Sequence, residues 1–119
     1  IRERTKADFA ILSGDDLTAC PMALLGGDGV ISVASNVAPR TMGDMMRASL
    51  AGEVTRAREL HCSLRPLFAA LFLESNPIPV KAALNMLGRP AGVPRLPLVP
   101  ATSEEQARVR AALEDAGLL

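Results

Sequence analysis

Two short apolar runs, separated by one expected helix, constrain the fold of this chain more than any other feature. The runs are "FAIL" at 9–12 and "GVISVAS" at 29–35, and both are nearly continuous instead of alternating, which is typical of strands buried on both faces of a parallel sheet. The helix between them is expected to begin after Asp15 and Asp16 and to end at Gly26, so the unit is a strand–helix–strand crossover. Because two such strands need neighbours at their open edges, we expect an α/β chain that carries the last two strand–helix units of a larger parallel sheet or barrel.

Three glycines, at positions 26, 27 and 29, raise the alternative of a phosphate-binding loop. Such a loop follows a strand and directly precedes a helix, whose free N–H groups bind the anion. Here the order is reversed, because the glycines follow the expected helix and precede the second apolar run. They are therefore interpreted as a helix end and a tight turn into a strand.

From Pro39 onwards the sequence is expected to be largely helical. A first helix begins at Pro39 and ends at about Ala51, before Gly52. A second begins at Glu53 and is expected to kink at Pro66. Its apolar side chains recur at three- and four-residue steps and are expected to form one buried stripe: Val54, Ala57, Leu60, Leu64, Leu67, Leu71 and Phe72.

The last third of the chain is expected to contain two more helices and an extended connector. One helix starts at Pro79 and ends at Gly88, and residues 89–100, with four prolines, form an ordered connector. A capping box for the final helix is offered by Thr102 with Glu105 or by Ser103 with Gln106. We predict two units: residues 1–52, the last two strand–helix units of a barrel, and residues 53–119, a C-terminal helical domain.

Composition excludes several classes of function. The 119 residues are 49% hydrophobic and carry 13 basic and 13 acidic side chains, which argues against a nucleic acid or an anionic membrane as the main partner. The longest apolar stretch, at 66–73, is too short to span a membrane, and no secretory signal is visible, so a cytoplasmic location is expected. Cys20, Cys62 and the single histidine do not form a metal-binding pattern. The chain begins without Met, in what resembles a helix already under way, and is expected to be part of a longer protein.

Polar side chains follow both apolar runs, where the chemistry of parallel barrels is carried out. They are "SGDD" at 13–16 and, after the second run, Ser35 and Asn36. Two adjacent acids would repel a phosphate group, so a phosphate site is not expected there. The acids can cap the helix that follows, or Asp15 can instead contact an amino or hydroxyl group of a substrate.

No residue of the chain is a convincing catalytic nucleophile or base. Lys6 precedes its strand and so lies at the wrong face for a Schiff base, and Lys81 is expected on a distant helix, solvated or in a salt bridge. His61 lacks an evident partner, which favours a packing or surface role. Asp28 also precedes its strand and is interpreted as a turn residue.

Five segments in the same order resemble the C-terminal portion of the dihydrodipicolinate synthase (4-hydroxy-tetrahydrodipicolinate synthase) family, which includes N-acetylneuraminate lyase. The segments are "SGDD" at 13–16, "GGDGVISVASNVAP" at 26–39, "RPLFAALFLESNPIPVKAAL" at 65–84, "RLPLVP" at 95–100 and the closing "RAALEDAGLL". The resemblance implies a (β/α)8 TIM barrel followed by a helical C-terminal domain. It also implies that this chain begins in the helix before strand seven and contributes strands seven and eight.

The resemblance further implies a lyase of lysine and diaminopimelate biosynthesis. This family condenses pyruvate with aspartate semialdehyde to 4-hydroxy-tetrahydrodipicolinate, without a cofactor or metal, through a Schiff base on a lysine of strand six. That lysine is expected upstream of Ile1, so the chain alone would hold no catalytic residue and be inactive. Carried over residue by residue, Ile31 contributes to the pyruvate site through its backbone, Gly14 and Asp15 line the semialdehyde side, and Asn76 lies near the entrance.

Two alternatives remain open on the sequence. The first is a relative with the same scaffold and imine chemistry, such as N-acetylneuraminate lyase or a keto-deoxy sugar acid aldolase, because substrate choice among these enzymes is determined largely in the upstream half. In a non-enzyme alternative, the chain is a self-standing helical interaction module. The family interpretation instead expects the missing N-terminal barrel half and further copies of the chain, as a homotetramer, to be the partners.

Overall fold

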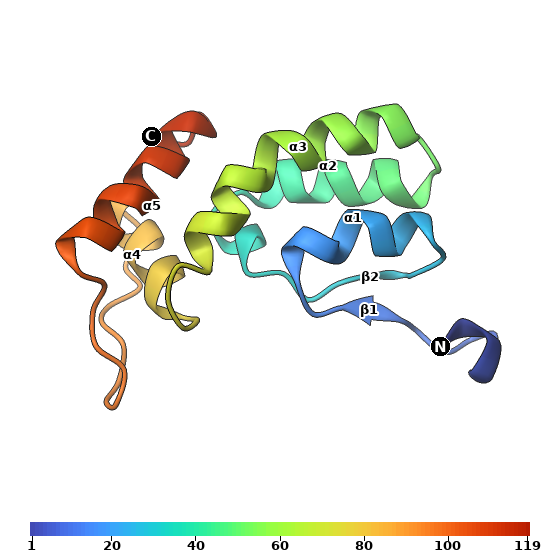
Figure 1. Ribbon diagram of the computed structural model, residues 1–119, viewed down its shortest axis with the longest axis horizontal. Helices are drawn as coiled ribbons and strands as arrows, with labels where there is room; N and C mark the ends of the chain where they lie inside the picture. Colours follow the sequence, from blue (N-terminus) through green and yellow to red (C-terminus); the bar gives the residue numbers. More distant parts are fainter.

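A computed structural model describes all 119 residues, from Ile1 to Leu119. Two short strands lie at one edge of the molecule and five α-helices pack above and beside them (Figure 1). The strands are β1 (Leu12–Ser13) and β2 (Gly29–Val30). The helices are α1 (Asp16–Leu24), α2 (Pro39–Leu50), α3 (Val54–Leu71), α4 (Ile78–Met86) and α5 (Ser103–Asp115), and two short 3-10 turns are η1 (Arg2–Arg4) and η2 (Ala34–Asn36).

The two strands are parallel, as the sequence predicts. Leu12 pairs with Gly29 and Ser13 with Val30, with α1 as the crossover between them. Both strands are shorter than predicted: "FAIL" contributes only Leu12, and "GVISVAS" leaves the ladder after Val30 to form η2. The physical reason is that each strand has one neighbour, so no second ladder holds the rest of either run extended.

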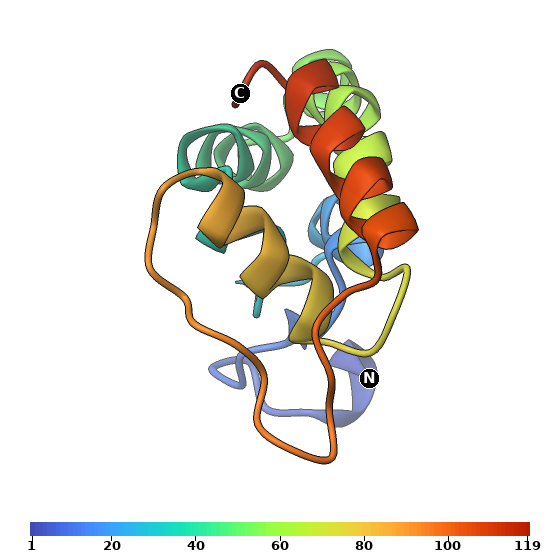
Figure 2. The ribbon, with the colours of Figure 1, turned by 90° about the vertical axis from the view of Figure 1, so that its left-hand side faces the viewer.

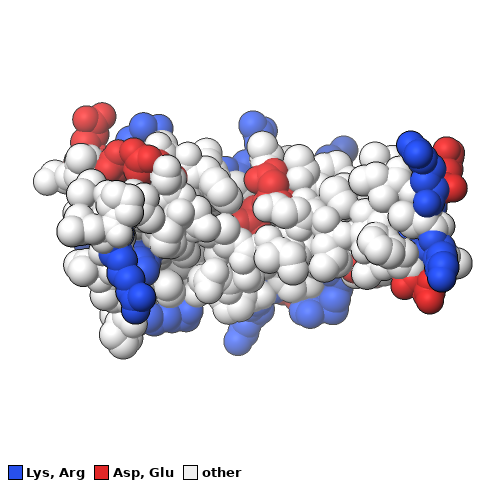
Figure 3. All heavy atoms as spheres, turned by 90° about the horizontal axis from the view of Figure 1, so that it is seen from below, with Lys and Arg blue, Asp and Glu red and all other residues white.

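The apolar side chains of the strand region are not enclosed by this chain. Phe9 is 55%, Leu12 47% and Ile31 68% exposed, so the expected burial on both faces is absent here. Seen from the strand side, much of the surface is uncharged. One group of acidic side chains lies near its middle, and most of the other charged side chains lie around its rim (Figure 3). This uncovered surface is the side on which a parallel sheet would add further strands.

Helix α1 begins and ends at the signals present in its sequence. The Asp15 carboxylate accepts a hydrogen bond from the backbone N–H of Thr18 at 3.1 Å and so caps the helix. Beyond Leu24 the chain turns through Gly26, whose φ of +94° suits a glycine. Pro21 lies in the second turn of α1, where one intrahelical donor is lost.

The helical core runs through the whole molecule. Helices α2 and α3 are joined by a tight turn at Gly52 and lie side by side above α1 (Figure 1). The predicted stripe of α3 is buried except at its ends, where Val54 and Phe72 are exposed. A single cluster connects all five helices, including Ala19, Cys20, Met42, Met45, Met46, Ala57, Leu64, Leu67, Leu71, Ala83, Val109 and Leu113. The division after residue 52 stays a prediction.

Helices α4 and α5 close the other end of the molecule. Figure 2 shows α5 beside α3, with α4 next to it and the connector at 89–100 running as a long loop between them. Of the two capping boxes that the sequence offers for α5, Thr102 with Glu105 is the one that forms. No helix of the chain has the length and apolar character needed to cross a membrane.

Candidate substrate-binding site

The carboxyl end of β1 forms one side of the candidate site. Ser13 is buried, and its hydroxyl lies 2.9 Å from the Thr18 hydroxyl and donates to the carbonyl oxygen of Asp15 at 2.8 Å. Gly14 is exposed, and a Cβ added there would meet no atom within 4 Å. The segment 13–15 is therefore held by its own hydrogen bonds and leaves open space in front of Gly14.

The end of β2 lies directly beside this segment. The backbone N–H of Ile31 donates to the carbonyl of Ser13 at 2.8 Å, so Ile31 is adjacent to Gly14. In Figure 1 both strands run from the N-terminal edge toward the centre of the molecule. The Ser35 hydroxyl donates to Ser32 and the Asn36 amide to Val33, so these two side chains stabilise the turn itself.

Asn76 is not joined to the other three predicted residues. It is exposed in the loop between α3 and α4, and its peptide bond to Pro77 is cis. No hydrogen bond connects it to Gly14, Asp15 or Ile31, but α4 packs against η2 at the end of the strand pair. Gly14, Asp15 and Ile31 are thus brought together, and Asn76 lies apart from them in the loop between α3 and α4.

Asp16 is the residue of this region whose role the sequence did not reveal. Only Asp15 caps α1; Asp16 is 1% exposed, and its Oδ2 accepts from the backbone N–H groups of Val33 at 3.0 Å and Ala34 at 2.8 Å. The available signal was helical spacing, because Asp16 shares its face with Ala19, Cys20 and Ala23, all of which are buried. A carboxylate on the apolar face of a helix is expected to have a specific partner.

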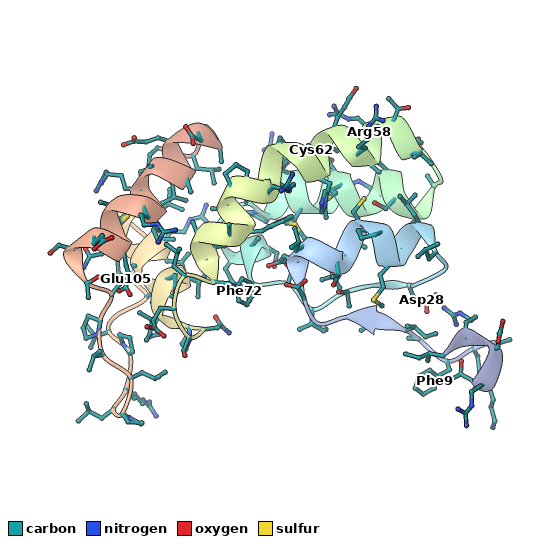
Figure 4. The ribbon with its side chains drawn as sticks, in the orientation of Figure 1. Phe9, Asp28, Arg58, Cys62, Phe72 and Glu105 are labelled. Atoms are coloured by element: carbon teal, nitrogen blue, oxygen red, sulfur yellow. The ribbon has the colours of Figure 1, made fainter.

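The remaining ionisable groups lie away from the strand ends. Figure 4 places Asp28 at the N-terminal end of the strand pair, near η1, where hydrogen bonds from the Ile11 backbone and the Arg2 side chain lower the pKa of its carboxyl group. Burial, with a smaller contribution from Arg65, lowers the pKa of His61 on α3. Neither group contacts Gly14, Asp15 or Ile31.

Lys81 is half-buried and forms no salt bridge, but it has specific backbone partners that the sequence did not reveal. Its ammonium group donates to the carbonyls of Ala91 at 2.7 Å and Val93 at 3.2 Å, and so holds the connector against α4. Cys20 is buried, Cys62 is exposed, and neither forms a disulfide. No group of three or more potential metal ligands is present. The chain's own side chains at the strand ends therefore offer hydrogen-bonding and backbone groups, without an amine nucleophile.

Comparison with known proteins decides the family. The model of the dihydrodipicolinate synthetase family matches residues 1–116. The chain belongs to the dihydrodipicolinate synthetase family. The resemblance inferred from the five sequence segments is thereby confirmed.

Relatives within the dihydrodipicolinate synthetase family match along the whole chain. The 4-hydroxy-tetrahydrodipicolinate synthase of Moorella thermoacetica is 53% identical over 119 residues, which are 100% of this chain and 41% of the relative. That of Archaeoglobus fulgidus is 50% identical over 97% of this chain and 40% of the relative. The crystal structure of dihydrodipicolinate synthase from Aquifex aeolicus superimposes with a TM-score of 0.96 at 47% identity, covering 99% of this chain and 40% of that one.

The chain therefore spans about two fifths of the length of these dihydrodipicolinate synthases. Its structural neighbours are TIM-barrel proteins, and its parallel β1–β2 pair with α1 as crossover corresponds to part of such a barrel. The predicted fold class is confirmed at this level.

Proposed function

We propose that this chain forms the C-terminal part of a 4-hydroxy-tetrahydrodipicolinate synthase, contributing strands seven and eight of its barrel and the helical C-terminal domain. The observation that carries the proposal is the match of residues 1–116 to the family, with identities of about one half to synthases along the same length. The whole protein would be a cytoplasmic homotetramer that condenses pyruvate with aspartate semialdehyde in lysine and diaminopimelate biosynthesis.

In this proposal the chemistry begins on a lysine outside residues 1–119. The lysine amine adds to the ketone of pyruvate, and loss of one water gives the imine that later reacts with the aldehyde. A Schiff-base lysine has to be desolvated at the catalytic end of a strand. Lys81 is bound to two connector carbonyls, and Lys6 precedes β1, so neither meets this requirement.

The segment at the strand ends supplies binding groups. We assign the backbone of Ile31 to the pyruvate, and Gly14 and Asp15 to the semialdehyde. The adjacency of Ile31 to Ser13 supports this assignment, because it brings both substrate sides within one hydrogen-bonded segment. Asp15 already accepts a bond from Thr18 through one oxygen, and its second oxygen is free to accept from a substrate. Asn76 would lie near the entrance.

Borohydride trapping tests this function. The full-length protein that carries this sequence is incubated with pyruvate and reduced, and the labelled peptide is found by mass spectrometry. We expect one labelled lysine outside residues 1–119, with Lys6 and Lys81 unlabelled, and turnover only when aspartate semialdehyde is added. Label on Lys6 or Lys81 would contradict the site assignment, and turnover with a sugar acid instead of the semialdehyde would favour the related aldolases.

A further inference from the structure

Asp16 connects the two halves of the candidate site through one oxygen atom. It is the first residue of α1, directly after the Gly14–Asp15 segment, and its Oδ2 accepts from the backbone N–H groups of Val33 at 3.0 Å and Ala34 at 2.8 Å. These groups lie 17 and 18 residues further along the chain, just after Ile31. Asp16 thus links the loop after β1 to the loop after β2.

The loop after β2 depends on this carboxylate. Val33 is the N-cap of η2, and its own side chain cannot accept a hydrogen bond from the turn. Ala34 is completely buried, so its N–H group has no access to solvent. Without Asp16, two N–H groups would lose their acceptor, one of them in the interior, which is costly.

A second connection lies two residues earlier. The N–H of Ile31 donates to the carbonyl of Ser13, so residues 31–34 are held against residues 13–16 at both ends. The backbone bond alone leaves the chain free to rotate beyond Ile31, and the Asp16 carboxylate removes that freedom. The position of the Ile31 carbonyl relative to Gly14 is therefore fixed by two attachments instead of one.

Only one of the two carboxyl oxygens of Asp16 is used for hydrogen bonding. Its Oδ1 is buried and has no hydrogen-bond partner, so the side chain gains its bonds through Oδ2 alone. A charged acceptor forms stronger bonds to N–H groups than a neutral amide does. An Asn side chain would keep one acceptor oxygen but replace the buried, unpaired Oδ1 by an NH2 group, whereas Ala would remove the acceptor altogether.

We propose that Asp16 is a positioning residue of the synthase: it fixes the loop that carries Ile31 relative to Gly14 and Asp15, and so sets the separation of the pyruvate and semialdehyde sides. This inference rests on the function proposed above. Asp16 does not touch a substrate in this role and acts through the backbone of residues 31–34.

Steady-state kinetics of the full-length protein test the role. We compare the wild type with Asp16→Asn, Asp16→Ala and the control Asp28→Asn, because Asp28 also accepts from a backbone N–H, that of Ile11, but at the opposite end of the same strands. For Asp16→Asn we expect kcat to fall at least tenfold and the KM for pyruvate to rise at least fivefold, with larger changes for Asp16→Ala. Asp28→Asn is expected to leave both constants within twofold, whatever it does to the melting temperature.

The outcomes separate the positioning role from the proposed function. A wild type that turns over pyruvate and aspartate semialdehyde, with Asp16→Asn unchanged in kcat and KM, would overturn the positioning role alone. Equal kinetic losses in Asp28→Asn would also overturn it, because the effect would then be one of general stability. A folded wild type without imine formation or turnover would overturn the proposed function, and this inference with it.

Discussion

The uncovered strand edges make a prediction about the 119-residue chain on its own. Phe9, Leu12 and Ile31 point into solvent beside two strands that each have one neighbour. Exposed apolar strand edges are templates for pairing with other chains. The chain expressed alone is therefore expected to self-associate. In the proposed synthase, the preceding part of the barrel, supplied as a separate polypeptide, is expected to replace this association by a defined complex.

The size of the effect follows from the exposed side chains. Complete burial of one such side chain contributes about 1.5–3 kcal/mol to the free energy of association. Each of the three is about half exposed, so covering one contributes about 1 kcal/mol or slightly more, and covering all three contributes about 3–4 kcal/mol. At about 1.4 kcal/mol per factor of ten, this strengthens association by about 100- to 1000-fold. Ladder hydrogen bonds at the open edges would add to this value.

A matched pair of variants isolates the contribution of the strand edge. Leu12, in β1, and Leu119, at the C-terminus, are both 47% exposed, so Leu12→Lys and Leu119→Lys introduce the same change at different places. Sedimentation equilibrium of the isolated chain should show self-association weakened about tenfold by Leu12→Lys, from the lost apolar contact and the added charge. Leu119→Lys should have little effect. A wild-type chain that is monomeric and unfolds cooperatively would refute the reasoning and favour an independent module.

Three further predictions concern the rest of the fold. Gly27→Ala places a Cβ 2.9 Å from the Met22 carbonyl oxygen and should lower the melting temperature by several degrees. At Gly43 in α2 the added Cβ meets only a flexible side chain, so Gly43→Ala should raise or preserve the melting temperature. The pKa of the Asp28 carboxyl group is lowered from the ordinary 3.8 in the folded chain, so its stabilising contribution is present above pH 3.8 and is lost as the pH falls through the folded-state pKa. The difference in melting temperature between wild type and Asp28→Asn should therefore shrink as the pH is lowered below 3.8. Lys81→Met should speed proteolysis within residues 89–100, because two hydrogen bonds to the connector are lost; an unchanged cleavage rate would show that these bonds do not hold it.

Local signals in the sequence were sufficient to predict the helices. Asp15 caps α1, Pro39 begins α2, and Thr102 with Glu105 forms the box that starts α5. Each of these signals acts within three or four residues, so it is visible in a single sequence. The parallel pairing of the two strands was also predictable, because the apolar runs and the helix between them leave one common topology.

Interactions between distant residues were not predictable in the same way. The lengths of β1 and β2 depend on neighbouring strands and not on the propensity of "FAIL" or "GVISVAS". Asp16 was interpreted as a possible cap of the helix that follows it. Its actual partners, Val33 and Ala34, are nearly 20 residues away in the chain, so local spacing does not reveal them. Lys81 was expected to be solvated or in an ion pair. Every residue has a backbone carbonyl, so the sequence does not show which carbonyls bind the lysine.

Folding and substrate binding are expected to depend on the same uncovered edge. The helices enclose one core from α1 to α5, whereas Leu12 and Ile31 stay exposed beside Gly14. Strands that cover these apolar side chains would at the same time complete the walls around the site, so a change that weakens the covering should lower stability and activity together. Leu12→Lys is of this kind. Asp16→Asn acts on the loop after β2, inside the existing core, and should lower activity more than stability, so the two variants distinguish completion of the barrel from positioning of its site.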